Sequence, residues 1–202
     1  MSIGTTTSKT RRYRKRRRAE LELETRHRIA AATARLHGTV GPARTTVSAI
    51  AEEAGVQRST VYRHFPDDQA LFDGCTAHFY GRHPMPDIER WVGIADPDER
   101  LRRALTDLYA WYGETEDMLS NTQRDAAFVP RPTRDRFLGY FRATRETLSR
   151  GRQERGRPSA RLAAAIGHAI AFPTWRSLVR EQGLDDAEAV ELMVRMVAAA
   201  GR

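Results

Sequence analysis

The chain has 202 residues, a formal net charge of +8 and one cysteine, Cys75. A chain of this length can bury a hydrophobic core without a metal or disulfide. A lone cysteine excludes an intrachain disulfide, as is typical of proteins from a reducing cytoplasm. The longest nearly apolar stretch, residues 162–172, is interrupted by His168 and is shorter than the roughly 18 residues of a membrane span. We therefore expect a soluble, cytoplasmic protein with no membrane partner.

The positive charge is concentrated at the N-terminus. Residues 1–18 contain no acidic side chain, and residues 19–202 carry equal numbers of basic and acidic groups. The basic residues of the first segment are Lys9, Arg11, Arg12, Arg14, Lys15, Arg16, Arg17 and Arg18. The polar sequence that follows Arg18 is unlike a secretory or twin-arginine signal. We predict that residues 1–18 form a disordered arm that binds DNA, through phosphates or the minor groove, with contacts from Arg12, Arg14, Arg16, Arg17 and Arg18. A solvated tail that keeps the protein soluble is the alternative interpretation.

Three short helices are predicted within residues 19–66. The first spans residues 25–38, where apolar residues recur at helical spacing before Gly38. The second contains residues 47–54 and follows a cap at Thr45 or Thr46. The third lies between Gly55 and Phe65, because Gly55 breaks the preceding pattern and Pro66 interrupts the chain again.

A larger helical domain is predicted over residues 67–202. Its first helix begins at Gln69 after a cap at Asp67 or Asp68, and residues 81–87 form a loop. The later helices are expected over residues 98–112, 133–148, 160–182 and 186–200. Pro173 is expected to kink the helix over 160–182. Because no segment alternates as a strand does, the predicted fold class is all-α.

The segment GVQRSTVYRHF, residues 55–65, combines a narrow apolar stripe with a broad polar face. On a helix, Val61 and Phe65 share one face, and Ser59, Thr60, Tyr62 and Arg63 spread over the other. The spacing from Ala51 to Gly55 and on to Val61 fits a helix-turn-helix, whose second helix enters the DNA major groove. Arg63 can bind guanine edges or a phosphate, Ser59 and Thr60 bases or backbone, and Tyr62 and His64 phosphates.

The sequence TTVSAIAEEAGVQRSTVYRHFPDDQALF, residues 45–72, resembles the DNA-binding signature of TetR-type repressors. The resemblance is specific over about residues 25–75. It implies an all-α homodimer with an N-terminal helix-turn-helix domain that binds a palindromic operator in double-stranded DNA. It also implies a C-terminal domain that dimerises and binds a small ligand, which lowers DNA affinity. The predicted DNA-binding residues of this region are Arg44, Thr45, Thr46, Gln57, Arg58, Ser59, Thr60, Tyr62, Arg63 and His64.

Three positions depart from the TetR pattern. Gln57 stands where a serine or threonine helix cap is usual, so the recognition helix is expected to start less firmly. Asp68 stands where a lysine commonly touches a phosphate, so one backbone contact is expected to be missing. Arg58 is unusual at its position, so the operator sequence cannot be transferred from other members.

Other functions are weighed against this one. The sequence has no glycine-rich phosphate loop, no GxSxG and no HExxH, so we predict neither enzymatic activity nor a cofactor. Cys75 with His78 and His83 would offer ligands for a soft metal, but a buried cysteine beside surface histidines is the preferred interpretation, and no metal site is predicted. The alternative function is an architectural DNA-binding protein without an effector, whose DNA affinity is dominated by the basic arm.

Two further groups of residues are predicted in the C-terminal domain. A pocket for a small hydrophobic or aromatic effector is assigned to Tyr109, Trp111, Tyr112, Phe128, Phe141 and Trp175. A dimer interface is assigned to Leu162, Ile166, Ile170, Leu178, Val190, Met193, Val194 and Val197. For both groups, packing within the subunit's own core is the alternative.

Overall fold

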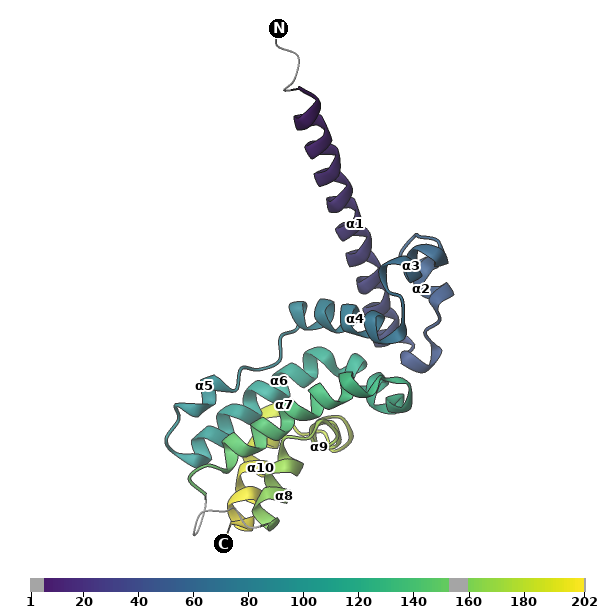
Figure 1. Ribbon diagram of the computed structural model, residues 1–202. Helices are drawn as coiled ribbons and strands as arrows, with labels where there is room; N and C mark the ends of the chain where they lie inside the picture. The colour runs from purple at the N-terminus through teal and green to yellow at the C-terminus, as the bar shows by residue number, and fades with distance from the viewer. Residues whose placement is uncertain (1–5, 153–159, 202) are drawn as a thin grey trace. The chain divides into compact units, whose positions relative to one another are not determined.

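A computed structural model describes residues 6–152 and 160–201, and within these ranges every regular element is helical (Figure 1). This confirms the predicted all-α fold class. The helices fall into two compact units, Met1–Arg82 and His83–Arg202. None of the described helices is long and apolar enough to cross a membrane.

The first unit contains α1 (Thr6–Thr39), η1 (Pro42–Arg44), α2 (Val47–Glu53), α3 (Arg58–His64) and α4 (Asp68–Arg82). α1 packs against α4 and α2, and α2 packs against α3. Their apolar faces meet in one core formed by Ile29, Ala30, Ala32, Ile50, Ala51, Ala54, Val61, Phe65 and Leu71. Small residues at several of these positions let the short helices approach closely.

The first helix is much longer than residues 25–38. The structure continues α1 back to Thr6, where we expected a disordered arm over 1–18; residues 1–5 lie outside the described residues. Arginine, lysine, leucine and glutamate all favour helix, and residues 6–24 contain no glycine or proline. Ion pairs one turn apart join Arg16 to Glu20 at 2.9 Å and Arg18 to Glu22 at 3.2 Å. Such pairs stabilise an exposed helix modestly.

α4 belongs to the first unit, whereas we expected residue 67 to open the C-terminal domain. Leu71 is part of the same core as Ile29 and Ile50. Cys75 is buried on α4, and its Sγ lies 3.5 Å from Nδ1 of His37 on α1. Because the Leu71 and Cys75 side chains of α4 are buried against α1, the boundary between the units falls after Arg82.

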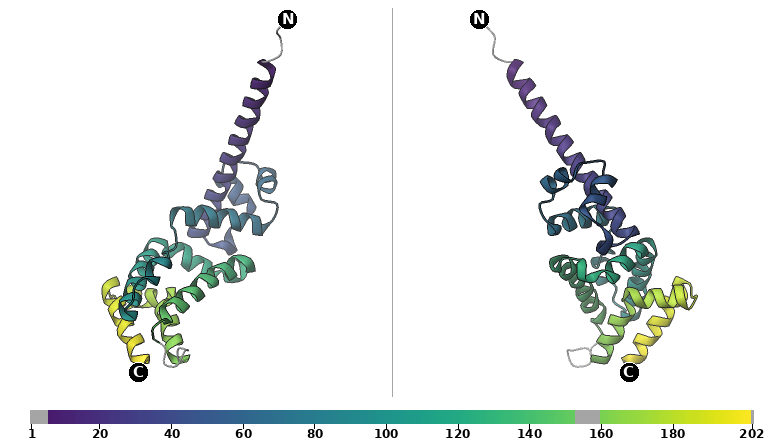
Figure 2. Two further views of the ribbon diagram at one scale, coloured as in Figure 1. Left: turned by 60° about the vertical axis from the view of Figure 1, so that its left-hand side comes forward. Right: turned by 90° about the vertical axis from the view of Figure 1, so that its right-hand side faces the viewer.

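The second unit contains α5 (Glu89–Val92), α6 (Pro97–Arg124), η2 (Ala126–Phe128) and α7 (Arg131–Ser149), then α8 (Ala160–Ala169), α9 (Phe172–Arg176), the π-helical turn η3 (Ser177–Glu181) and α10 (Asp186–Ala200). α6 supplies much of the core, and α10 packs against both α6 and α8. α8 and α10 lie side by side in both views of Figure 2.

The helix expected over residues 160–182 is interrupted rather than kinked. α8 ends at Ala169, and Ala171 is extended with φ −80° and ψ 134°. Pro173 then lies in the first turn of α9, where its missing N–H costs no helical hydrogen bond. The last helix starts with a capping box, in which the Asp185 side chain accepts from Glu188 N at 2.8 Å and Glu188 accepts from Asp185 N at 2.9 Å.

Candidate nucleic-acid interface

α2 and α3 are joined by a tight turn. The Thr46 side chain caps α2 by accepting from Ala49 N at 3.1 Å. After α2, Gly55 has φ 62°, a left-handed conformation that favours glycine. Val56 N then donates to Ala51 O at 2.9 Å, which closes the turn and starts the chain toward α3. This is the arrangement of a helix-turn-helix.

α3 has one buried face and one exposed face. Val61 and the following Phe65 are 1% and 2% exposed, and both belong to the core of the first unit. Arg58, Ser59, Tyr62 and Arg63 are exposed, and Thr60 is half-buried. The exposed face therefore presents two guanidinium groups, two hydroxyls and an aromatic ring on a rigid helix, and these groups can contact bases and phosphates.

The loops before the two helices carry the remaining predicted contacts. Gln57 occupies the N-cap of α3 and makes no side-chain cap hydrogen bond, as its residue type predicts. Arg44 and Thr46 are exposed, and Thr45 is half-buried and donates from Oγ1 to Gly41 O at 2.9 Å. Thr45 thus stabilises the loop with its hydroxyl proton and is less available to donate to DNA.

Arg26 of α1 holds the end of α3, a role that sequence reasoning missed. Its Nη1 donates to the carbonyl of His64, and its guanidinium carbon lies 4.1 Å from the centre of the Phe65 ring. A cation at the C-terminal end of a helix is favoured by the helix dipole. The sequence gives one indication of this role: Arg26 precedes Ile29 by three residues, which places it on the core side of α1.

Residues 29–75 match the family model described as "Bacterial regulatory proteins, tetR family". This segment is a TetR-family domain. The TetR-type resemblance is thereby confirmed, and the family is one of transcriptional regulators.

Solved structures extend the likeness to most of the chain. A tetR-family transcriptional regulator from Streptomyces coelicolor has a TM-score of 0.63 and 19% identity, with 88% of this chain and 80% of that chain covered. A TetR-like transcriptional regulator from Rhodococcus sp. RHA1 has a TM-score of 0.55 and 22% identity, with 88% and 97% covered. At these identities the likeness establishes a shared fold. No curated protein matches the chain.

His64 of the TetR domain differs from the exposed residues around it. Its Nε2 is buried and makes no hydrogen bond to the described residues. Burial first, and then the nearby charges of Arg63 and Arg26, lower the pKa of His64. The neutral ring is therefore favoured, and because Nε2 is buried, the predicted donation to a phosphate would have to come from Nδ1. His64 contributes to the TetR domain through its backbone carbonyl, which accepts from Arg26.

The basic segment that precedes the TetR domain is exposed on α1. Arg12, Arg14, Arg16, Arg17 and Arg18 are all exposed. Arg16 and Arg18 each pair with a glutamate one turn later. Surface pairs of this kind are weak, so all five guanidinium groups are accessible to a polyanion.

The Cys75 thiol has low reactivity. Burial raises the pKa of the Cys75 thiol to about 12, so the thiol stays protonated at neutral pH. A protonated thiol is a poor metal ligand. In the part of the chain that the structure describes, no three or more histidine, cysteine, aspartate or glutamate side chains come together as a metal site would require.

The aromatic residues predicted to bind an effector do not form one cluster. Tyr109, Trp111, Tyr112 and Trp175 are buried, while Phe128 is 63% exposed. Phe141 is half-buried and packs against Phe137 and Tyr140, with ring centres 4.9 and 5.2 Å apart. The six residues therefore occupy three different environments.

The four buried aromatics are packed, and their polar atoms have partners. The Tyr112 ring contacts Tyr109, Trp111 and Trp175. Tyr109 Oη donates to Ala169 O at 2.8 Å, and Tyr112 Oη donates to Ile170 O. Trp175 Nε1 donates to Asp186 Oδ1 at 2.9 Å. Because the rings fill the interior and their donors are satisfied, they act as the core of the second unit in this structure.

The residues predicted to form a dimer interface pack inside the subunit. Leu178 is half-buried and the other seven are at most 5% exposed; the seven are Leu162, Ile166, Ile170, Val190, Met193, Val194 and Val197. They are covered because α10 packs on α6 and α8, so they do not supply an exposed surface. The large apolar side chains exposed on α10 are Leu192 and Met196, at 39% and 50%. These two are one helical turn apart and therefore share a face.

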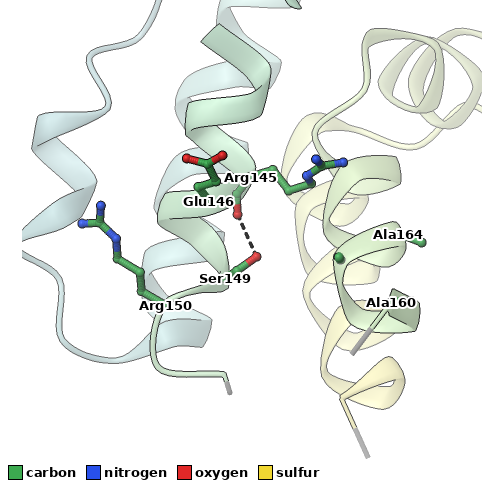
Figure 3. A pocket seen from close by; sticks show the side chains of 7 residues that line it. Arg145, Glu146, Ser149, Arg150, Ala160 and Ala164 are labelled. Carbon is green, nitrogen blue, oxygen red and sulfur yellow. Dashed lines mark hydrogen bonds between the residues drawn. The ribbon is translucent and has the colours of Figure 1, made fainter. Parts of the chain in front are cut away.

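A hollow lies between α7 and α8, lined by Arg145, Glu146, Ser149, Arg150, Ala160, Ala163 and Ala164 (Figure 3). Its volume is about 720 Å³. The Arg145 side chain extends toward α8, whereas Arg150 points away to the other side of α7 (Figure 3). None of the six aromatics predicted to bind an effector lines it.

Proposed function

We propose that the protein is a homodimeric transcriptional repressor that binds a palindromic operator and is released by a small-molecule effector. The observation that carries the proposal is the exposed face of α3 within a TetR-family domain, where Arg58, Ser59, Tyr62 and Arg63 are exposed opposite the buried Val61. Helices presented in this way read bases from the major groove.

The exposed side chains have different roles in this proposal. Arg63 and Arg58 bind guanine edges or phosphates, and a bidentate arginine–guanine pair contributes about 1–3 kcal/mol of discrimination. Tyr62 and Ser59 donate to phosphates or bases. Arg44, Thr46 and Gln57 precede the two helices, where they can contact the backbone on either side of the groove.

A second copy of the chain is required for a palindrome. Two-fold symmetry in the protein is matched by two-fold symmetry in the operator. Since the apolar residues first assigned to the interface are buried in the subunit, we assign the dimer surface to the exposed face of α10 around Leu192 and Met196. The neighbouring α8 is rich in alanine and would allow close helix approach.

Release by an effector requires two conformations of the dimer. The effector must bind the non-operator-binding conformation more tightly, because only a difference in affinity shifts the equilibrium. The second unit is the place we propose for it, because it contains the hollow between α7 and α8, whose volume is about 720 Å³. The class of effector we propose is a small hydrophobic or aromatic molecule, for which Ala160, Ala163 and Ala164 supply the apolar part of the lining.

The proposal is tested by selecting the purified protein against random duplex DNA at about 0.15 M salt, where charge interactions are screened as in a cell. Recovery of a palindrome is expected. Arg63→Ala should then weaken binding to the selected site by about tenfold or more, and Arg82→Ala, a charge-matched change at the exposed end of α4, should not. Recovery of A·T-rich sequence without symmetry would instead support an architectural protein whose affinity comes from its basic segment.

A further inference from the structure

The basic segment has a defined orientation relative to α3, because both are attached to the same continuous helix. Arg26 marks the face of α1 that contacts α3, through the His64 carbonyl and the Phe65 ring. At 3.6 residues per turn, Lys15 lies about three turns before Arg26 and Arg12 about four turns before it. Lys15 and Arg12 therefore share the Arg26 face of α1.

The opposite face of the same segment carries different side chains. Arg17 precedes Arg26 by about two and a half turns, and Arg14 is displaced from the Arg26 face by about 120°. Glu20 and Glu24 also project from this far side, by the same helical phase. All four residues are exposed, as are Arg12 and Lys15. The far face thus carries two acidic residues, of which Glu20 is paired with Arg16. The near face has one acidic residue near Arg26, Glu22, which is paired with Arg18.

α3 shows on which side of α1 the DNA would lie. Its buried residue Val61 faces the core, and Arg58, Tyr62 and Arg63 project outward. Since α3 lies on the Arg26 face of α1, a duplex that receives α3 in its groove lies on that same side. Lys15 and Arg12 then stand about 16 and 21 Å along α1 from Arg26, at 1.5 Å per residue.

We infer that the Arg12 and Lys15 face of α1 binds the phosphates that flank each half-site, while the Arg14 and Arg17 face points away from the duplex. This inference rests on the proposed function, because it takes the orientation of the DNA from α3. It assigns the basic segment a defined contact surface outside the sequence that α3 reads. Phosphate contacts of this kind add affinity and salt dependence without adding base specificity.

Two double variants with equal loss of charge test the inference: Arg12→Gln/Lys15→Gln on the near face and Arg14→Gln/Arg17→Gln on the far face. Glutamine keeps a helix propensity close to that of lysine and arginine, and far-ultraviolet circular dichroism checks that helix content is unchanged. Binding is measured against salt concentration on two duplexes. Both contain the palindrome recovered by selection, and one adds about one helical turn of DNA, ten base pairs, on each side.

On the flanked duplex the near-face variant should lower the slope of log affinity against log salt by about 0.9 for each phosphate that the variant no longer neutralises. The far-face variant should leave that slope close to the original, and on the unflanked duplex the two variants should behave alike. An equal decrease of slope for both variants on the flanked duplex would overturn the inference alone. A selection that yields no palindrome, with no effect of Arg63→Ala, would overturn the proposed function and this inference with it.

Discussion

The guanidinium carbon of Arg26 lies 4.1 Å from the centre of the Phe65 ring, and its Nη1 donates to the neighbouring His64 carbonyl. One side chain of α1 therefore fixes the end of α3. Arg26→Ala removes both contacts and is expected to lower the free energy of unfolding by about 1–2 kcal/mol. Urea unfolding followed by circular dichroism measures the change. Arg28→Ala removes the same charge from an exposed position of α1, and an equal effect of that variant would contradict the assignment.

Gly74 lets α4 lie directly against Phe65. A Cβ added at Gly74 would lie 2.9 Å from Phe65 Cζ and closer still to Cε1, and Phe65 is buried and held by Arg26. Gly74→Ala should therefore destabilise the protein by about 1–3 kcal/mol through overpacking. Gly81→Ala on the same helix meets no atom within 4 Å, and it should be neutral or stabilise by up to about 1 kcal/mol. Thermal unfolding of the two variants would refute this account if both shifts had the same sign.

Gln57 leaves the start of α3 without a side-chain cap. Gln57→Ser supplies an oxygen for the first-turn amides, and we expect a gain in stability of about 0.5–1 kcal/mol. Thr46→Ala is the reciprocal change, because the Thr46 side chain caps α2 at 3.1 Å, and it should cost about 1 kcal/mol. The denaturant midpoints of the two variants and of the wild type measure these changes in stability. No gain from serine would mean that α3 is held by its packing rather than by its cap.

His64 should make stability depend on pH. Its pKa is lowered in the folded protein by burial and by Arg63 and Arg26, so the unfolded chain binds more protons near and below pH 6.5. Stability must then rise with pH in this range, and it is lost as the pH falls from about 6.5 through the lowered pKa. His64→Gln should reduce the difference between melting temperatures at about pH 7.5 and 5.5. His78 has a lowered pKa as well, so the wild type and the variant must be compared directly; an unchanged difference would exclude His64.

The amphipathic pattern of the sequence is enough to locate most of the helices and the exposed face of α3. This is because helical periodicity and capping are local properties: Val61 and Phe65 fall on one face whatever surrounds them, and Thr46 caps the helix that follows it. The same pattern identifies the TetR-family motif. The pattern does not predict the full length of α1, since the charged residues before Glu20 show no apolar stripe to mark a helix.

Periodicity shows that a residue lies on an apolar face, but not which neighbour covers that face. Met193 and Val197 fit a dimer interface as well as a core, and only the packing of α10 on α6 and α8 buries them within one subunit. Likewise, the sequence pattern alone allows Tyr112 to line a ligand pocket, but in the structure its hydroxyl donates to the Ile170 carbonyl in the core. The contact of Arg26 with Phe65 joins residues far apart in the chain, and the close approach of Gly74 to Phe65 joins α4 to the end of α3. Such contacts depend on how the helices cross, which no local spacing specifies.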